Sequence, residues 1–222
     1  MCGKFTQMMG WGAHVRLADL IGNAGSASET VTPMRFATLI HLAADGQRQA
    51  ARMRWGLVPP WAKDPNMASF IHARAESIDE RPTYRDAFRH RRGILAVQTF
   101  NEGKEITPHK TEQHVIAAND AAPIAIAVIW ERWGEVRSGK GLETFAMVTV
   151  PPNRLIATIT DRMPAVIQPH RWSRWLGEEP ASVQALKDML VPCEGDWTMR
   201  PAPQAGRARP SPDESDPQLP LL

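Results

Sequence analysis

Apolar residues occur in short runs separated by glycine, proline and aspartate, a pattern typical of β structure. After a short N-terminal strand, the runs that predict strands are Phe36–Leu42, Gln49–Trp55, Gly93–Phe100, Ile124–Trp130 and Glu143–Val150. The turn Asp45-Gly46 lies between the first two runs and favours a hairpin. Glu143–Val150 is apolar on both faces, so we expect it near the centre of a sheet.

Helical spacing is confined to short segments. It predicts helices at Trp11–Ile21, from Thr83 as a cap, at Arg171–Leu176 and at Ala181–Leu190. In the helix after Thr83, Tyr84 and Phe88 form an apolar pair one turn apart. A second stripe of that helix, the arginine stripe, consists of Arg81, Arg85, Arg89 and Arg92. It is either a rail for phosphates or a solvated basic face.

The composition is that of a globular protein, with 43% hydrophobic and 23% charged residues among 222. We expect one domain, 1–205, and a disordered Pro-rich tail, 206–222, because the tail has few residues to bury. The longest apolar run, Ala121–Trp130, is interrupted by Pro123 and is too short to span a bilayer, and the N-terminus lacks a signal pattern. A cytoplasmic protein that contacts no membrane is expected, with Cys2 and Cys193 reduced.

Neither the net charge nor the spacing of the histidines indicates a particular function. The net charge is +2, so bulk charge does not by itself identify a nucleic-acid-binding protein. His109 and His114 flank Lys110–Gln113 in a predicted hairpin, but no cysteine partners or HExxH spacing accompany them. We therefore expect ordinary surface histidines, no metal site and no cofactor.

The thiol of Cys2 lies where the chemistry of a chain terminus can reach it. If Met1 is removed, Cys2 carries an α-amine beside its thiol, and this pair suits attack on an aldehyde. The amine condenses to an imine, and the thiol then closes a five-membered ring on the same carbon. Their ordinary pKa values, about 7.7–8.0 for the amine and about 8.5 for the thiol, leave a minority of each nucleophilic near neutral pH, so neighbouring groups must tune them.

Three other stretches carry candidate chemistry. Trp55–Trp61 holds two prolines that keep it out of helices and sheet ladders, and its tryptophans either plug the core or stack on bases. Arg74 and Glu76, two apart in an extended segment, are expected to face one way and can pair. The Gly93–Phe100 strand is expected to deliver Glu102 to a loop at its end.

Five segments follow one another in a recognisable order. They are Met1-Cys2-Gly3-Lys4-Phe5, Trp55-Gly56-Leu57-Val58-Pro59-Pro60-Trp61-Ala62, Ala73-Arg74-Ala75-Glu76, Tyr84-Arg85-Asp86-Ala87-Phe88 and Asp161-Arg162-Met163-Pro164. Together they resemble the motifs of the SRAP family, whose members shield abasic sites in single-stranded DNA by covalent crosslinking. The resemblance runs from residue 1 to about residue 200.

This resemblance implies an α+β fold built on a curved, barrel-like, mainly antiparallel β-sheet with flanking helices. It implies a positively charged groove for single-stranded DNA and a pocket in which Cys2 forms a thiazolidine with the ring-opened abasic sugar. Glu102 matches the active-site glutamate of the family, which moves protons near the amine. The family also implies autoproteolytic peptidase and lyase-like activities.

The same resemblance implies the residues that hold DNA. Lys4, Arg74 and Arg162 are expected to bind the phosphates that flank the lesion. The remaining expected DNA contacts are Trp55, Pro59, Trp61 and Met163. The arginine stripe is then structural or peripheral.

Two active-site positions depart from the family pattern. His72 stands where the family has asparagine, and Thr160 stands where it has the histidine that donates protons. Thr30–Pro33 and Thr99–Gly103 also keep their motifs poorly, so this is a divergent member. One hypothesis is that His72 supplies the imidazole that Thr160 cannot, and the alternative is that His72 only fills space.

Three functions remain open at this stage. The first is crosslinking of abasic single-stranded DNA through Cys2 by a monomer that joins the nucleoid on damage. The second is a non-catalytic relative that only binds single-stranded DNA. The third is a thiol hydrolase in which the amine of Cys2 is the base, and it leaves the arginine and tryptophan motifs without a role beyond packing.

Overall fold

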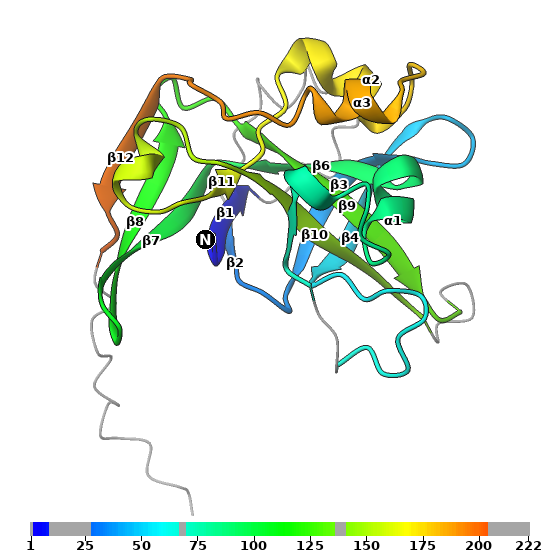
Figure 1. Ribbon diagram of the computed structural model, residues 1–222, viewed down its shortest axis with the longest axis horizontal. Helices are drawn as coiled ribbons and strands as arrows, with labels where there is room; N and C mark the ends of the chain where they lie inside the picture. The colour runs from blue at the N-terminus through cyan, green and yellow to red at the C-terminus, as the bar shows by residue number, and fades with distance from the viewer. Residues whose placement is uncertain (1, 9–27, 67–69, 136–140, 204–222) are drawn as a thin grey trace, which may run out of the picture.

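The computed structural model describes residues 2–8, 28–66, 70–135 and 141–203 (Figure 1). Its strands are β1 (Lys4–Met8), β2 (Ser28–Val31), β3 (Phe36–Leu42), β4 (Arg48–Trp55), β5 (His72–Arg74), β6 (Arg92–Val97), β7 (Thr99–Thr107), β8 (Lys110–Ala118), β9 (Ile124–Trp133), β10 (Leu142–Val150), β11 (Met163–Pro164) and β12 (Trp197–Pro201). Its helices are α1 (Arg85–His90), α2 (Trp172–Leu176) and α3 (Val183–Lys187), with 3-10 turns η3 (Ala75–Ser77), η5 (Ile156–Thr158) and η6 (Pro169–Arg171). The predicted helix Trp11–Ile21 and the tail 206–222 lie outside the described residues.

The centre of the fold is a small barrel. Its strands run in the order β10-β4-β3-β6-β9, and β9 pairs back with β10 to close the ring. Every pairing in the ring is antiparallel except that of β4 with β10. β10 also pairs with β5 and β11, so the prediction that Glu143–Val150 lies centrally is confirmed. Closure leaves most of β9 and β10 buried on both faces, which explains the apolar runs Ile124–Trp130 and Phe145–Val148.

A second, fully antiparallel sheet runs in the order β12-β8-β7-β1-β2. It flares away from the barrel and carries the start of the chain, while α2 and α3 lie along one edge of the molecule (Figure 1). Helix α1 packs on β6 and β9, and α2 packs on β6. The predicted α+β architecture with a barrel-like, mainly antiparallel sheet and flanking helices is confirmed.

Local predictions had mixed outcomes. The Asp45-Gly46 hairpin is confirmed, with Gly46 at a φ of 79° and β3 paired to β4. Helix α1 forms, but its cap is Tyr84 rather than Thr83 and makes no side-chain capping bond. The predicted strand 93–100 is two strands, β6 and β7, divided at Gln98.

The arginine stripe does not form a rail on one helix. Arg92 lies in β6, and its guanidinium donates to the backbone carbonyls of Phe88 and Trp175 at 2.8 and 2.6 Å. Arg81 precedes α1. The stripe is therefore broken by the end of the helix, and Arg92 ties the surrounding elements together.

Candidate active site

Strand β1 is held to the barrel by two buried side chains. The ring of Phe5 lies 5.2 Å from that of Trp55, which in turn stacks on Phe145 at 6.4 Å. Gln7 donates to the carbonyl oxygens of Thr38 and Ala96 at 2.8 and 3.0 Å, and its own oxygen accepts from the Thr38 N–H at 2.9 Å. These contacts fix β1, and with it the segment that begins at Cys2.

Cys2 is buried at the start of this strand, with 1% of its surface exposed. Its thiol donates to the Lys4 carbonyl oxygen at 3.5 Å. Burial, and next the negative charge of Glu102, raise the pKa of the thiol to about 12. The thiol is therefore protonated at neutral pH, and it would have to lose its proton to act as a nucleophile.

Glu102 faces Cys2 from the neighbouring strand. β1 and β7 pair through Lys4 and Asn101, so the chain before Lys4 runs beside Glu102. Burial raises the pKa of the Glu102 carboxyl to about 7, while the backbone N–H of Cys2 acts to lower it and the charge of Asp161 acts to raise it. Glu102 lies within β7, so the expectation of a strand-end loop is wrong. A carboxyl with this pKa can both accept and donate protons near neutral pH.

His72 approaches Cys2 from β5, on the barrel side. Burial lowers the pKa of its imidazole to about 4, and the Cys2 backbone acts weakly in the opposite direction. Its ring lies 6.1 Å from that of Trp55 in an edge-to-face arrangement. The structure thus brings together Cys2, Glu102 and His72, with the Cys2 backbone interacting with both other groups.

Thr160 and Asp161 border the side of Glu102. They line a cavity of about 510 Å³ together with Gly103, Glu105, Thr111, Gln113 and Ile159. Thr160 is half-buried and Asp161 is exposed. Asp161 is a site residue that the sequence reasoning missed, and its place beside the expected Thr160 was the available signal.

Arg74 lies on the opposite side, beside His72. It lines a cavity of about 380 Å³ with His72, Ser77, Arg81 and Tyr84. Arg74 and Arg81 are both exposed, and Lys4 is half-buried. These cations are accessible to an anionic ligand near Cys2, and Arg81 was not among the expected contacts.

Arg162 binds groups within the protein. It is 8% exposed, and its guanidinium makes a two-pronged ion pair with Glu76 and donates to the Thr149 carbonyl oxygen at 2.7 Å. In this structure Arg162 thus ties η3 to β10, and the expected phosphate contact through Arg162 stays a prediction. Glu76 lies in η3, so the expected pairing of Arg74 with Glu76 is replaced by this one.

The expected DNA contacts from the apolar motifs divide by exposure. Trp55 and Met163 are fully buried, and Pro59 is also buried, while the DNA contacts expected of these three residues stay predictions. The indole N–H of Trp55 donates to the Ile71 carbonyl oxygen at 2.9 Å, as in a core residue. Trp61 is 62% exposed and is available for stacking. Trp55 therefore packs in the core, whereas stacking on a base stays a prediction for Trp61.

His114 differs from the surface histidine that was expected. It is 9% exposed and lies directly opposite Glu102 in the β7–β8 register, so the two side chains share a face of the sheet. Its Nε2 lies 3.7 Å from a Glu112 carboxylate oxygen. Among the residues that the structure describes, no group of three or more His, Cys, Asp and Glu side chains is arranged to hold a metal ion.

Comparison with known proteins agrees with this arrangement. The family model "SOS response associated peptidase (SRAP)" matches residues 1–205. Abasic site processing protein YoaM of Bacillus subtilis is 28% identical over 200 residues, 88% of each chain, and YoqW of the same organism is 29% identical over 202 residues, 88% of this chain and 89% of its own. In the described part of the chain, no helix is both long enough and apolar enough to cross a membrane.

Solved structures share the fold. A protein of Bordetella bronchiseptica has a TM-score of 0.73 at 20% identity, covering 91% of this chain and 100% of its own. A protein of Bacteroides thetaiotaomicron has a TM-score of 0.71 at 21% identity, covering 90% of this chain and 92% of its own. Since the family model spans almost the whole chain and begins at Met1, ahead of the buried Cys2, this protein belongs to the SRAP family.

Proposed function

We propose that this protein binds single-stranded DNA at an abasic site and, once Met1 is removed, forms a thiazolidine crosslink through Cys2 that shields the lesion. The observation that carries the proposal is the burial of Cys2 between Glu102 and His72, in a family whose relatives are named for abasic site processing. The protein would act as a monomer in the cytoplasm, at the nucleoid after damage.

The proposed chemistry uses the two groups of Cys2 in sequence. The amine adds to the aldehyde carbon of the ring-opened sugar, and loss of water leaves an imine. The thiol sulfur then bonds to the same carbon, and the imine nitrogen takes up the thiol proton to become a secondary amine. The sum is one aldehyde and one aminothiol giving one thiazolidine and one water, with no oxidant or metal required.

Glu102 is the group that we assign to these proton transfers. The backbone nitrogen of Cys2, which acts on the Glu102 carboxyl, is the atom that becomes the amine when Met1 leaves. As a carboxylate, Glu102 takes a proton from the ammonium form of this amine. As a carboxylic acid, it protonates the hydroxyl that departs as water. A pKa of about 7 makes both forms available at neutral pH.

The DNA strand is proposed to lie over the exposed residues around this pocket. Arg74 and Lys4 would bind phosphates on either side of the lesion, and the exposed indole of Trp61 would stack on an unpaired base. Arg81 shares the cavity of Arg74 and would add a further phosphate contact. Buried aromatic residues such as Trp55 only support the walls.

The test is incubation of the protein with a single-stranded oligonucleotide that carries one abasic site, followed by a denaturing gel. We expect a heat-stable shifted band with the wild type and none with Cys2→Ala. Cys2→Ser is the matched control, because it keeps the amine, as Cys2→Ala does, and replaces the thiol by a hydroxyl of similar shape. It should give a band only after borohydride reduction of the imine.

Each other outcome overturns a stated part of the proposal. Binding without a band would favour the non-catalytic relative. Absence of both binding and band, with a folded protein, would favour a thiol hydrolase. A band of equal strength with Cys2→Ala would show that another residue forms the crosslink.

A further inference from the structure

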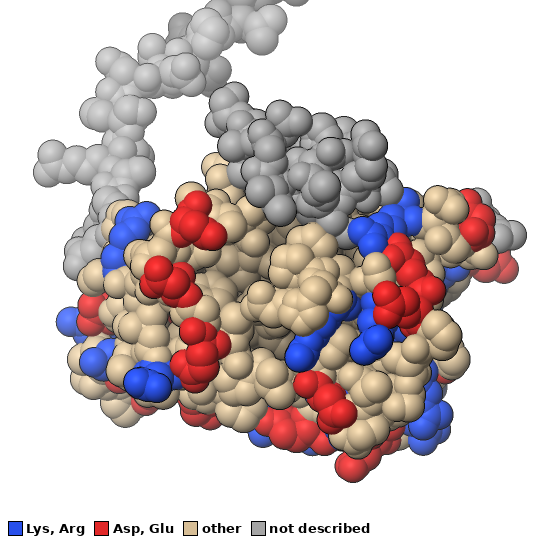
Figure 2. Space-filling view, turned by 90° about the horizontal axis from the view of Figure 1, so that it is seen from above, with Lys and Arg blue, Asp and Glu red and all other residues tan. Residues whose placement is uncertain are grey.

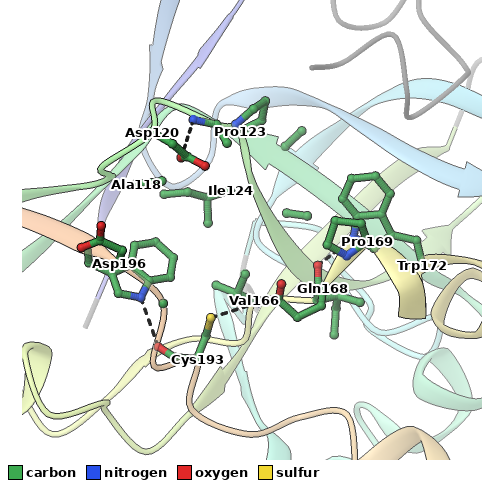
Figure 3. Close-up of a pocket in the computed structure, with 16 residues that line it drawn as sticks. Ala118, Asp120, Pro123, Ile124, Val166, Gln168, Pro169, Trp172, Cys193 and Asp196 are labelled. Atoms are coloured by element: carbon green, nitrogen blue, oxygen red, sulfur yellow. Dashed lines mark hydrogen bonds between the residues drawn. The ribbon is translucent and has the colours of Figure 1, made fainter. Parts of the chain in front are cut away.

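A third cavity lies apart from Cys2 and shares no lining residue with the two cavities described above. It has a volume of about 350 Å³, near the lower end of the range of about 300–1,000 Å³ for small-molecule sites. Its walls come from the start of β9, the segment between β11 and α2, and the loop before β12 (Figure 3). The crosslinking chemistry proposed above makes no use of it.

The cavity is mainly apolar, and the polar edges of its tryptophans are already bonded within the protein. The indole N–H of Trp172 donates to the Ile167 carbonyl oxygen at 2.7 Å, and that of Trp197 donates to the Cys193 carbonyl oxygen at 3.2 Å. Both rings therefore offer carbon surface to the cavity. A ligand needs an apolar body to fill this space.

The charged residues of the lining are Asp120 and Asp196, both exposed at its margin. One oxygen of Asp120 accepts from the Ala122 N–H at 2.9 Å, and one of Asp196 accepts from the Asn119 side chain at 2.5 Å. The second oxygen of each carboxylate remains able to accept from a ligand. These internal bonds also hold both carboxylates in place.

The charges and the apolar wall face one another across the cavity. Asp120 and Asp196 lie on one side, and Pro169 and Trp172 lie on the other (Figure 3). Figure 2 shows the molecule from above, with a hollow near the middle of that face and acidic side chains among those around it. A bound molecule that spans the cavity meets negative charge at one end and an aromatic surface at the other.

We propose that this cavity binds a small organic ammonium ion with an aromatic or aliphatic body. The ammonium group donates to the carboxylates of Asp120 and Asp196, and the body packs on Pro169 and the ring of Trp172. A neutral ligand of the same shape loses the charge-assisted hydrogen bonds, and an anion is repelled.

Cys193 makes occupancy measurable. Its half-buried sulfur lines the cavity and accepts from the Gln168 side chain at 3.2 Å. A molecule in the cavity should shield this thiol from alkylation. The other cysteine, Cys2, is 1% exposed and is read on a different peptide.

The test measures the rate at which iodoacetamide alkylates Cys193 in the full chain, by mass spectrometry of its peptide. The probes are 2-phenylethylammonium, its neutral isostere 2-phenylethanol and the anion 3-phenylpropanoate. We expect saturable protection by the ammonium probe, half-maximal at a concentration about tenfold or more below that of the alcohol, and none by the anion. Equal protection by all three probes, or none by the ammonium probe, would overturn the proposal.

Variants separate charge from shape. The double variant Asp120→Asn/Asp196→Asn keeps an oxygen for each internal bond, so it should reduce the ammonium probe to the potency of the alcohol. Asp45→Asn is the matched control, since Asp45 also accepts a turn N–H at 3.0 Å but lies elsewhere, and it should change nothing. Ala122→Trp, at a half-buried position in the segment before β9, should fill the cavity and end protection by both the ammonium probe and the alcohol. Undiminished ammonium protection in either the double variant or the filled variant contradicts the site.

Discussion

Glu102→Gln tests whether burial of the ionised Glu102 carboxylate lowers the free energy of unfolding. Burial gives the Glu102 carboxyl a pKa of about 7 in place of 4.5. Between these pH values the unfolded chain has released the proton while the folded chain still holds it. The free energy of unfolding therefore falls as pH rises from 4.5 to 7, and stays lower above pH 7. The pKa difference corresponds to about 3 kcal/mol.

The glutamine variant cannot ionise, so it should escape this loss. We expect Glu102→Gln to be more stable than the wild type by about 2–3 kcal/mol at pH 8, or about 5–10 °C in Tm, and about equal to it near pH 4. Its crosslinking rate should fall by about 100-fold or more, because general acid–base catalysis is lost. The assays are urea unfolding across pH and the denaturing-gel time course.

The comparison has an internal control. Glu105 lies exposed on the same strand, so Glu105→Gln should change neither the stability nor its pH dependence. Carboxylates common to both proteins cancel in the difference between variant and wild type. If Glu102→Gln is no more stable than the wild type at pH 8, burial does not raise the pKa of this carboxyl and the reasoning fails.

Two further pairs of substitutions and one single substitution distinguish structural from functional residues. Arg162→Ala should lower the free energy of unfolding by about 1–3 kcal/mol. Arg74→Ala should leave Tm unchanged and weaken single-stranded DNA binding. In titrations at several salt concentrations, Arg74→Ala should also reduce by about 0.7 the slope of the logarithm of the binding constant against the logarithm of the salt concentration. Trp55→Ala should lower the free energy of unfolding in urea by about 3–5 kcal/mol, and Trp61→Ala should lower it by less than about 0.5 kcal/mol. Trp61→Ala should instead weaken DNA binding about 10- to 100-fold. A larger loss of stability for Trp61→Ala than for Trp55→Ala would contradict the burial argument. Because the pKa of His72 is about 4, below its ordinary 6.5, the wild type loses up to about 3 kcal/mol as pH falls from 6.5 to 4, and His72→Asn should lack this loss in a paired pH series.

Local pattern was enough for several of the strands. Apolar runs bounded by turn residues predicted β3, β4 and β10, because period and turn chemistry act within a few residues. The resemblance placed Cys2 and Glu102 together, and the structure brings them into one buried pocket.

Long-range partners were beyond the reach of the pattern. The ion pair of Arg162 with Glu76 was not predicted, since nothing nearby in the sequence shows that Glu76 binds it from 86 residues away. Trp55 and Trp61 have the same side chain in one motif, yet closure of the barrel buries the first and leaves the second in solvent. Burial of His114 likewise depends on its register with Glu102.

The pKa values favour Glu102 over His72 as the proton donor of the proposed reaction, in which Thr160 replaces the family histidine. At pH 7 Glu102 is about half protonated, whereas about one His72 in a thousand carries the proton, given a pKa of about 4. His72 therefore starts about a thousandfold behind as a proton donor, although it remains available as a neutral acceptor. Crosslinking should follow one titration near pH 7 that Glu102→Gln abolishes and His72→Asn preserves, with less than about a tenfold change in rate for the asparagine variant. A titration that disappears in His72→Asn would assign the proton transfers to the imidazole instead.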